Sequence, residues 1–321
     1  MATGNAGLSA ASASELAVGS APELRLGNWR LGPVAGTGSW CTVYRARPAS
    51  AASTDHYDYV VKVLRPNYET DGIASAMLAT EVRFARSVNH SRLVPVLASQ
   101  ISRPPYYIVM PYIRGRTLSL LIDRVGRLAI PKAIWFARQA LEGLVAIHTA
   151  GWIHGDIKSA NLLVQPSGAL SLFDFGLART IGEPGATPAG TSLLCGTPGY
   201  AAPELHFDCF PVTPASDIYS LGITLFEMLA GRRPFDGPSP HELAAAHLRQ
   251  PPPDLQSLVP AVPIRLKWLI QEMIAKQPDH RPTTDVALRR LVELEIASLF
   301  DYDRGRSRRN SGMVAELGRG D

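Results

Sequence analysis

Three polar side chains stand close together in the stretch HGDIKSAN, residues 154 to 161, between two apolar runs. Phosphoryl transfer needs a carboxylate to orient the attacking hydroxyl, a cation near the moving phosphoryl group and an oxygen ligand for Mg²⁺. Asp156, Lys158 and Asn161 are residues of those three types. The spacing therefore points to phosphoryl-transfer chemistry in a short loop.

A second candidate metal ligand, Asp174, directly follows LSLF, residues 170–173, which is predicted to be an apolar strand, and it precedes Phe175 and Gly176. Amide and carboxylate oxygens suit Mg²⁺, which takes most of its remaining ligands from phosphates and water. Asn161 and Asp174 are therefore the predicted metal pair.

The N-terminal third offers a phosphate-binding turn and a cation. Gly36 and Gly38 lie between two apolar runs, where glycine lets backbone N–H groups approach phosphates closely. Lys62 ends the apolar run YVVK, and a Lys there is costly unless it is paired or holds an anion. A Gly-rich hairpin or a strand-end Lys alone has an ordinary structural explanation. Glu81, on the next predicted helix, favours the functional explanation because it could pair with Lys62.

The elements that must position these residues change character along the chain. The apolar patterns predict a hairpin over 28–47, strands over 56–64 and 106–113, and a helix over 75–88. From about residue 113 helices dominate, with helices predicted over 132–151, 216–231, 265–276 and 285–300. A β-rich half followed by an α-rich half predicts a two-lobed α+β protein with a ligand cleft between the lobes.

Taken in order, these motifs resemble those of the eukaryotic-type (Hanks-type) protein kinases. The matching residues are the Gly-rich loop, Lys62, Glu81, His154-Gly155-Asp156 with Asn161, Asp174-Phe175-Gly176 and Ala202-Pro203-Glu204. The resemblance covers residues 28–297 and implies a bilobal protein kinase fold of the α+β class. Its N-lobe (28–112) would be small and β-rich with one main helix, and its C-lobe (113–297) larger and α-helical. Lys158 and the segment GTPGY are similar to serine/threonine kinases, and the Ala- and Arg-rich composition to bacterial members.

The resemblance implies a role for each matching residue. The implied catalytic set is Asp156, Lys158, Lys62 and Glu81, while Asn161 and Asp174 would hold Mg²⁺, with Mn²⁺ as an alternative. The implied ATP-binding residues are Val34, Gly36, Thr37, Gly38, Ser39, Trp40, Cys41, Val43, Val60, Lys62, Met110, Pro111, Ile113 and Leu163. Among them Met110 corresponds to the gatekeeper, and the carbonyl of Pro111 and the N–H of Ile113 would meet adenine.

Further residues are implied to hold or regulate the C-lobe. Glu204 should pair with Arg281. Asp217 should accept hydrogen bonds from the backbone of residues 154–156, although by itself it would be an ordinary helix N-cap. The candidate phosphorylation sites in the activation loop are Thr187, Thr191 and Ser192.

The sequence departs from the family pattern at two positions. Gly155 replaces the Arg that gathers phosphate from a phosphorylated activation loop, and glycine cannot supply that bidentate contact. We therefore expect activity that does not depend strongly on loop phosphorylation. Cys41 replaces the third glycine of the Gly-rich loop. A small side chain should be tolerated there, because the backbone N–H groups contact the phosphates, and the thiol should be reachable from the ATP cleft.

Composition limits the cellular setting. The 321 residues are 46% hydrophobic and 19% charged, with a net charge of +4 that is too small to argue for nucleic acid. Three cysteines without metal-ligand spacing indicate a reducing compartment. No secretory signal or membrane span is evident, so we expect a cytoplasmic protein. The Ala/Ser/Gly-rich segment 1–27 and the basic segment 298–321 are expected to be disordered tails. The oligomeric state does not follow from the sequence.

Two other functions fit parts of this pattern. A pseudokinase scaffold would bind nucleotide and protein partners with little transfer, but it has no need of the whole set of catalytic and metal-ligating residues. A small-molecule phosphotransferase of related fold has no need of GTPGYAAPE, residues 196–204, which resembles a peptide-binding segment. The expected function is therefore transfer of the ATP γ-phosphoryl group to Ser or Thr hydroxyls of proteins, including the protein itself.

Overall fold

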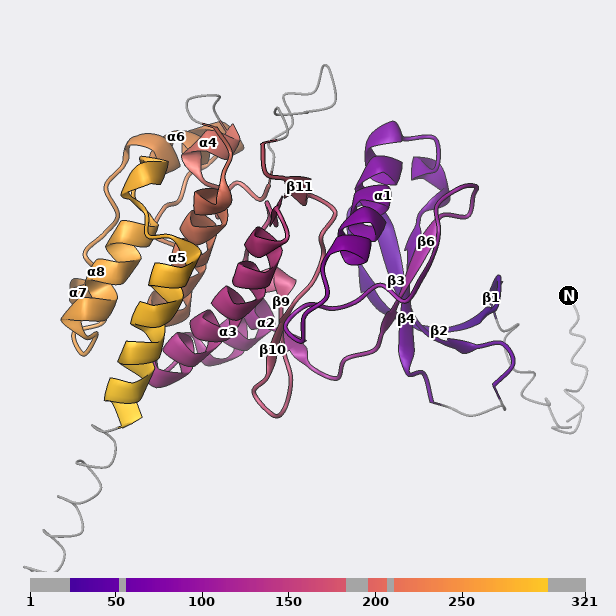
Figure 1. Cartoon of the computed structure of the whole chain (residues 1–321), viewed down its shortest axis with the longest axis horizontal. Coiled ribbons are helices and arrows are strands. Elements are labelled where there is room, and N and C mark those ends of the chain that lie inside the picture. Colours follow the sequence, from indigo (N-terminus) through magenta and orange to yellow (C-terminus); the bar gives the residue numbers. More distant parts are fainter. Residues whose placement is uncertain (1–23, 52–55, 183–195, 207–210, 300–321) are drawn as a thin grey trace, which may run out of the picture.

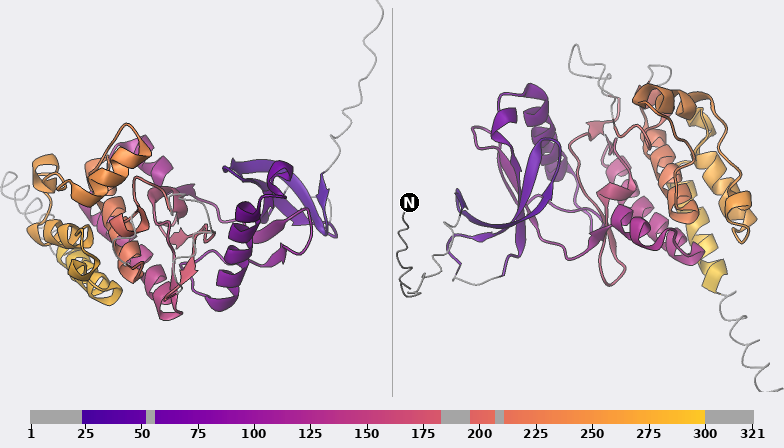
Figure 2. Two further views of the ribbon diagram at one scale, coloured as in Figure 1. Left: turned by 90° about the horizontal axis from the view of Figure 1, so that it is seen from above. Right: turned by 180° about the vertical axis from the view of Figure 1, so that it is seen from behind.

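Two lobes follow one another along the chain in the computed structural model, which describes residues 24–51, 56–182, 196–206 and 211–299 (Figure 1). The N-lobe consists of one antiparallel sheet and one long helix, and the C-lobe is mainly helical. Figure 2 shows the same two lobes side by side from two further directions. The architecture confirms the two-lobed α+β fold predicted from the sequence.

The N-lobe sheet has six strands in the order β1-β2-β3-β4-β6-β5, and every neighbouring pair is antiparallel. In β6, Ile108 and Met110 pack on the face that carries α1, whereas Val109 packs on the opposite face. Because both faces are buried, this strand is apolar throughout. The strands are β1 (Arg25–Leu26), β2 (Trp29–Thr37), β3 (Cys41–Pro48), β4 (Tyr59–Leu64), β5 (Ala98–Gln100) and β6 (Tyr107–Pro111).

The helix α1 (Gly72–Ser87) covers one face of this sheet. Asp71 begins it by accepting hydrogen bonds from the backbone N–H groups of Ile73 and Ala74. Its buried residues recur at helical spacing, and Glu81 is among them, between Leu78 and Val82. The same periodicity that packs α1 on the sheet therefore turns a carboxylate toward it.

The C-lobe is built around α3 (Ile130–Thr149) and α5 (Pro214–Ala230), which pack together inside the largest apolar cluster of the described residues. α5 is buried along nearly its whole length, as its continuous apolar sequence predicts, and Gly231 ends it in the left-handed conformation. The other helices are α2 (Leu118–Val125), α4 (Pro203–His206), α6 (Pro240–Arg249), α7 (Leu255–Leu258), α8 (Ile264–Met273) and one over 284–299, with 3₁₀ turns η1 (Pro66–Tyr68), η2 (Ser159–Asn161) and η3 (Pro278–His280).

Short strands at the junction of the lobes position the chemically interesting loops (Figure 1). They pair as β10-β9-β7 and β11-β8, where β7 is Arg116–Thr117, β8 Trp152–Ile153, β9 Leu162–Val164, β10 Leu170–Leu172 and β11 Arg179–Thr180. Residues 154–161 connect β8 to β9, and Asp174 comes shortly after β10. The sequence predicts the strand β10 before Asp174 from the apolar run LSLF, and the structure confirms it. The strands β7, β8, β9 and β11 were not predicted, because two or three residues carry too little alternation.

Hydrogen bonds fasten the segment after α1 to the C-lobe. The Val94 N–H donates to the Leu172 carbonyl at 2.9 Å, and the Leu172 N–H donates to the Arg92 carbonyl at 2.7 Å. The Arg92 side chain reaches α3, where it lies 2.5 Å from Gln139 Oε1 and 2.8 Å from Glu142 Oε2. The segment that follows α1 is therefore held against β10 and α3.

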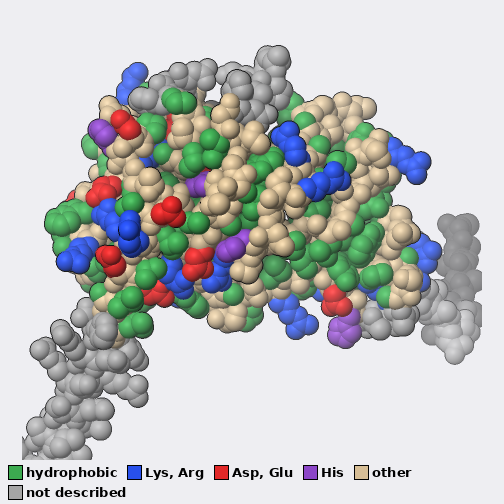
Figure 3. Space-filling model, viewed as in Figure 1, with side chains coloured by type: hydrophobic (Ala, Val, Ile, Leu, Met, Phe, Trp, Pro, Cys, Tyr) green, Lys and Arg blue, Asp and Glu red, His purple; other side chains and the backbone are tan. Residues whose placement is uncertain are grey.

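Charged side chains of both signs share the face seen in Figure 3, with acidic side chains gathered over the helical lobe and basic ones over both lobes. No helix among the described residues is both long enough and apolar enough to span a membrane.

Candidate active site

Lys62 is the centre of an ion cluster drawn from three separate elements. Its Nζ lies 2.8 Å from Glu81 Oε2 on α1 and 2.7 Å from Asp174 Oδ1 after β10. Burial alone would lower the pKa of Lys62, but the two carboxylates outweigh burial and raise it. The same ammonium group lowers the pKa of Asp174 against the effect of burial. The cluster thus keeps Lys62 positively charged at the point where β4, α1 and the segment after β10 meet.

The turn that carries Asp174 is locked to α1. Phe175 is buried and stacks on Phe84 of α1 with 4.1 Å between the ring centroids. Asp174 has φ 68°, and it is the one non-glycine residue with positive φ in the described part of the chain. An Asp tolerates this conformation better than most residues, at a cost of about 1–3 kcal/mol. The position of Asp174 is therefore maintained by packing around Phe175.

Asp156 lies in a dense hydrogen-bond network. Its Oδ2 accepts from Lys158 Nζ at 2.6 Å and from Asn161 Nδ2 at 3.0 Å. Its Oδ1 accepts from the backbone N–H of Thr197 at 3.0 Å and from Thr197 Oγ1 at 2.7 Å. Lys158 Nζ also donates to Thr197 Oγ1, at 2.6 Å. The structure thus brings the three polar residues of HGDIKSAN together and adds Thr197, which the sequence analysis missed although it stands within GTPGY.

Asp217 fixes the backbone of the loop that precedes Asp156. Its carboxylate accepts hydrogen bonds from the N–H groups of His154 at 2.8 Å and Gly155 at 2.9 Å. It also lies 2.9 Å from His148 Nε2. Burial would raise the pKa of Asp217, but these hydrogen bonds and charges lower it. Asp217 sits in the first turn of α5, whose N-cap residue is Thr213, so the N-cap alternative does not apply.

His148 is a second residue that sequence reasoning missed. It stands at the end of α3, and its Nδ1 lies 2.6 Å from Thr284 Oγ1 while its Nε2 contacts Asp217. A single His near a helix end gives no signal of such a role in the sequence. Its ring ties the loop at 154–156, through Asp217, to the start of the helix over 284–299.

The Gly-rich turn joins β2 to β3 in the N-lobe sheet. Gly36, Val43 and Lys62 are neighbours across β2, β3 and β4. A Cβ added to Gly36 would meet nothing within 4 Å, and one added to Gly38 would meet only the Cys41 carbonyl at 3.7 Å. Glycine is thus not required there by the packing of the protein itself, which fits a turn that leaves room for phosphates.

The other predicted ATP-binding residues stand on the N-lobe sheet, on the residues just after it and on β9. Met110 is buried on β6 opposite Val60, and Ile113 packs on the same apolar cluster. Val34 is 56% exposed on β2. The remaining positions are Thr37 on β2, Ser39 and Trp40 in the turn, Cys41 on β3, Pro111 at the end of β6 and Leu163 on β9. Burial raises the pKa of the Cys41 thiol, which makes it a weak nucleophile at neutral pH.

Asn161 and Asp174 are suited to a hard cation. The Asn161 amide nitrogen donates to the Asp156 carbonyl at 2.9 Å and to its carboxylate, so the amide oxygen is the group left for a ligand. No cluster of three or more His, Cys, Asp or Glu that could hold a metal exists in the part of the chain that the structure describes. A cation here would need oxygen ligands from phosphates and water, as Mg²⁺ does.

The segment 196–206 is anchored deep in the C-lobe. Glu204 forms a bidentate pair with Arg281, with N–O distances of 2.6 and 3.0 Å, and both side chains are fully buried. Tyr200 Oη donates to Glu227 Oε1 at 2.7 Å and lies 3.0 Å from Ser159 Oγ. The segment is thereby fixed beside the loop that holds Asp156. The candidate phosphorylation sites Thr187, Thr191 and Ser192 lie outside the described residues.

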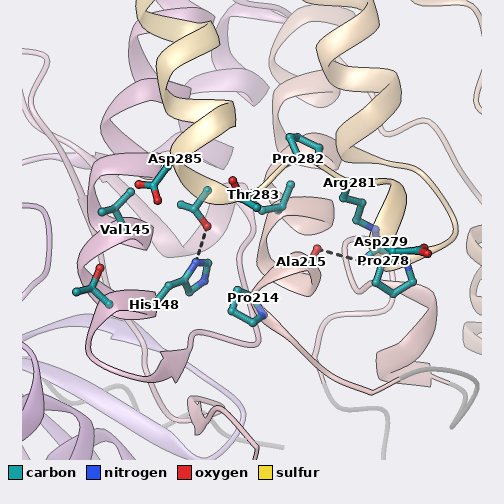
Figure 4. Close-up of a pocket in the computed structure, with 13 residues that line it drawn as sticks. Val145, His148, Pro214, Ala215, Pro278, Asp279, Arg281, Pro282, Thr283 and Asp285 are labelled. Carbon is teal, nitrogen blue, oxygen red and sulfur yellow. Dashed lines mark hydrogen bonds between the residues drawn. The ribbon is translucent and has the colours of Figure 1, made fainter.

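A cavity of about 500 Å³ on the C-lobe lies apart from this chemistry (Figure 4). It is lined by the end of α3, the start of α5 and residues 278–285, and His148 points into it beside Thr284. None of the predicted catalytic, ATP-binding or metal-ligating residues lines it. The candidate active site is therefore the pair of side-chain clusters around Lys62 and Asp156.

Comparisons with known proteins agree on one family. A family model described as the protein kinase domain matches residues 29–291. The chain is 34% identical over 253 residues to the serine/threonine-protein kinase drp72 of Corynebacterium efficiens, covering 77% of this chain and 47% of the relative. It is 33% identical over 265 residues to PknB of Mycolicibacterium smegmatis, covering 81% and 42%. It is 33% identical over 264 residues to PknA of Corynebacterium glutamicum, covering 81% and 54%. The chain thus spans about half the length of the curated relatives it matches.

Proposed function

We propose that this chain, which belongs to the protein kinase family, transfers the γ-phosphoryl group of ATP to Ser or Thr hydroxyls of proteins. The observation that carries the proposal is the convergence of Lys62, Glu81 and Asp174 beside the hydrogen-bonded set of Asp156, Lys158 and Asn161. The names of the relatives support Ser and Thr as acceptors. A pseudokinase would not need both clusters, and nothing in the structure favours that alternative.

Each side chain has a distinct task in the proposed reaction. The Asp156 carboxylate accepts a hydrogen bond from the incoming hydroxyl and orients it toward the phosphoryl group. Lys158, held beside Asp156 and Thr197, offers positive charge where the phosphoryl group moves. Lys62, kept charged and fixed by Glu81, binds the phosphates that remain with the nucleotide. Thr197 holds the Asp156 carboxylate in place.

Family membership implies ATP and a divalent cation, and we propose that the cation is Mg²⁺, with Mn²⁺ as a substitute. Asn161 and Asp174 would hold it, and the bound ion would neutralise charge on the phosphates. The open space at Gly36 and Gly38 would receive the phosphates, with Met110, Val60 and Ile113 forming apolar walls.

We extend the proposal to the setting of the enzyme. The kinase domain comprises residues 28–297 between two tails, and its location is the cytoplasm. Its partners are proteins with acceptor hydroxyls, with no role for nucleic acid. These statements remain predictions from the sequence.

Transfer of labelled phosphate from ATP tests the proposal. Asp156→Asn removes the negative charge that orients the hydroxyl, so we expect at least a roughly hundredfold loss of kcat with a far smaller change in ATP binding. Asp279→Asn, which changes an exposed carboxyl of the C-lobe, is the matched control and should leave transfer unchanged. Absence of transfer by the wild-type chain, to itself and to every peptide, would refute the proposal in favour of a scaffold.

We further propose that activity depends little on activation-loop phosphorylation, because Gly155 cannot bind a phosphate. Treatment with a phosphatase should lower the transfer rate less than roughly tenfold. The measurement compares treated and untreated enzyme after the phosphatase has been removed, with loss of loop phosphate checked by mass spectrometry. A larger loss would show that another cation takes over the task of the missing Arg.

A further inference from the structure

Arg233 places a guanidinium group against the segment that borders the acceptor site. A Cβ added to Gly199 would lie 1.8 Å from Nη1 and 2.7 Å from Cζ of Arg233, so the guanidinium occupies the space that a side chain at position 199 would take. The guanidinium carbon also lies 5.5 Å from the centre of the Tyr200 ring. Arg233 is therefore packed on residues 199–200, and it follows α5 just after the terminating Gly231.

The Arg233 guanidinium stands over the Tyr200 ring, and its charge acts to lower the pKa values of Glu227 and His247. Within the described residues the guanidinium forms no hydrogen bond and no ion pair within 4 Å. Glu227 is near enough to interact electrostatically with Arg233; its Oε1 accepts a hydrogen bond from Tyr200, and its buried Oε2 has no hydrogen-bond partner among the described residues. An arginine has five N–H donors in a planar fork that suits a carboxylate. This fork is half-buried and lacks such a partner.

The location of Arg233 relative to Asp156 determines what could reach it. Thr197 contacts the Asp156 carboxylate directly, and Gly199 is two residues further along, which is at most about 7.6 Å between the α-carbons. The guanidinium in contact with Gly199 is thus separated from the Thr197–Asp156 contact by two residues of chain. An extended peptide advances about 3.3 Å per residue, so a side chain within three residues of the acceptor would come within reach.

We propose that Arg233 is a specificity-determining residue that selects protein substrates with an Asp or Glu within three residues of the acceptor Ser or Thr. The inference rests on the proposed kinase function and adds the substrate class. The substrate carboxylate would accept hydrogen bonds from the guanidinium, whose aromatic neighbour Tyr200 and glycine neighbour Gly199 hold it in place. Lys158, a second cation near the acceptor site, is already paired with Asp156.

A positional peptide series tests the inference. Each peptide has one Ser in a neutral background, with a single Asp or Ala at one of the three positions on either side. For the wild-type chain we expect one or two positions where Asp raises kcat/KM about five- to tenfold over Ala, mainly through KM. The ratio of kcat/KM for the Asp peptide to that for the Ala peptide should fall as the salt concentration is raised, because the ion pair between Arg233 and the peptide is partly exposed.

Variants test whether Arg233, and not a neighbouring residue, sets the preference for Asp. Arg233→Ala should bring the Asp-to-Ala ratio close to one, and Arg233→Glu should replace the preference for Asp by one for Lys at the same position. Gly199→Ala should also lower the ratio, because its methyl group displaces the end of a flexible side chain and leaves the fold intact. Arg232→Ala, which changes the exposed neighbour, is the matched control and should keep the preference. Thermal denaturation of each variant checks that folding is retained.

Two failures are distinguishable. Transfer to all peptides at equal rates, or a preference for Asp that survives Arg233→Ala, overturns the inference and leaves the kinase function standing. Absence of transfer to any peptide, with no transfer to the protein itself, refutes the proposed function and the inference with it.

Discussion

Gly155 shows what a single residue decides in this molecule. It has φ +78°, and its N–H donates to Asp217. A Cβ at this position would lie 2.7 Å from the Leu177 carbonyl oxygen. Glycine takes this conformation without strain, whereas any other residue is both in an unfavourable backbone region and in contact with backbone that cannot easily move. Because glycine stands where the family has Arg, the loop before Asp156 takes this left-handed conformation without backbone strain.

We expect Gly155→Ala to lower the free energy of unfolding by about 1–3 kcal/mol, because strain at a left-handed position combines with the contact to Leu177. Chemical denaturation measures it. Gly151→Ala is the matched control: Gly151 has φ +80°, but nothing lies within 4 Å of its added Cβ, so the variant suffers backbone strain alone. Equal losses for the two variants would show that the contact with Leu177 is relieved at no cost.

At the scale of elements, a buried histidine fixes α6 on α5. His247 of α6 is fully buried, and its Nδ1 lies 2.9 Å from Tyr219 Oη of α5. The Phe235 ring packs against it at 4.8 Å, and Lys276 Nζ donates to its carbonyl at 2.7 Å. Burial, reinforced by the charges of His206, Lys276 and Arg233, lowers the pKa of His247 to about 3. The folded chain therefore holds this ring neutral over most of the acidic range.

This pKa predicts acid sensitivity. Below about pH 6.5 the unfolded chain binds a proton at His247 that the folded chain does not, so stability falls as the pH is lowered toward 3, by up to about 1.4 kcal/mol per pH unit. His247→Gln cannot titrate and should show a shallower loss between pH 6.5 and 4 in urea denaturation. His241→Gln changes an exposed histidine of the same helix and should follow the wild-type curve. Parallel curves of stability against pH for His247→Gln and the wild type would contradict a lowered pKa of His247 in the folded chain.

At the scale of the whole molecule, Arg281 joins parts of the C-lobe that are far apart in sequence. Besides Glu204 it donates to the carbonyls of Ala215 on α5 and of Ala275 and Lys276 after α8, at 2.8 to 3.0 Å. Glu204 Oε1 also accepts from Ser216 Oγ at 2.8 Å. The segment 196–206, which meets Asp156 at one end, is thereby anchored to the helical core at the other.

Removing one partner of the Glu204–Arg281 pair should lower the free energy of unfolding. Arg281→Met leaves Glu204 buried without its counter-charge, and we expect a loss of about 3–5 kcal/mol in the free energy of unfolding, measured by chemical denaturation. Adding Glu204→Leu to Arg281→Met should restore part of the loss, because an apolar pair needs no counter-charge. Arg290→Met, which breaks an exposed pair with Glu272, is the control and should cost less than about 1 kcal/mol. An equally small loss of unfolding free energy in Arg281→Met would mean that water reaches the Glu204 carboxylate.

The sequence by itself determined the fold class, the longer elements and the family. Apolar periodicity sets β4, β6, α1, α3 and α5, because each buries one or both faces against a core. The residue types of Lys62, Glu81, Asp156, Asn161 and Asp174 pointed to phosphoryl transfer, because few other tasks need that set in that order.

Only the tertiary structure decided which groups meet. Lys62 and Asp174 are 112 residues apart, and no local pattern encodes their 2.7 Å contact. Thr197 on Asp156, His148 on Asp217 and Arg233 on Gly199 depend on how helices and loops pack in space. The left-handed backbone of Gly155 likewise follows from its hydrogen bond to Asp217 and its approach to Leu177. Periodicity records which side of an element is buried, whereas a contact between distant elements depends on the three-dimensional path of the chain.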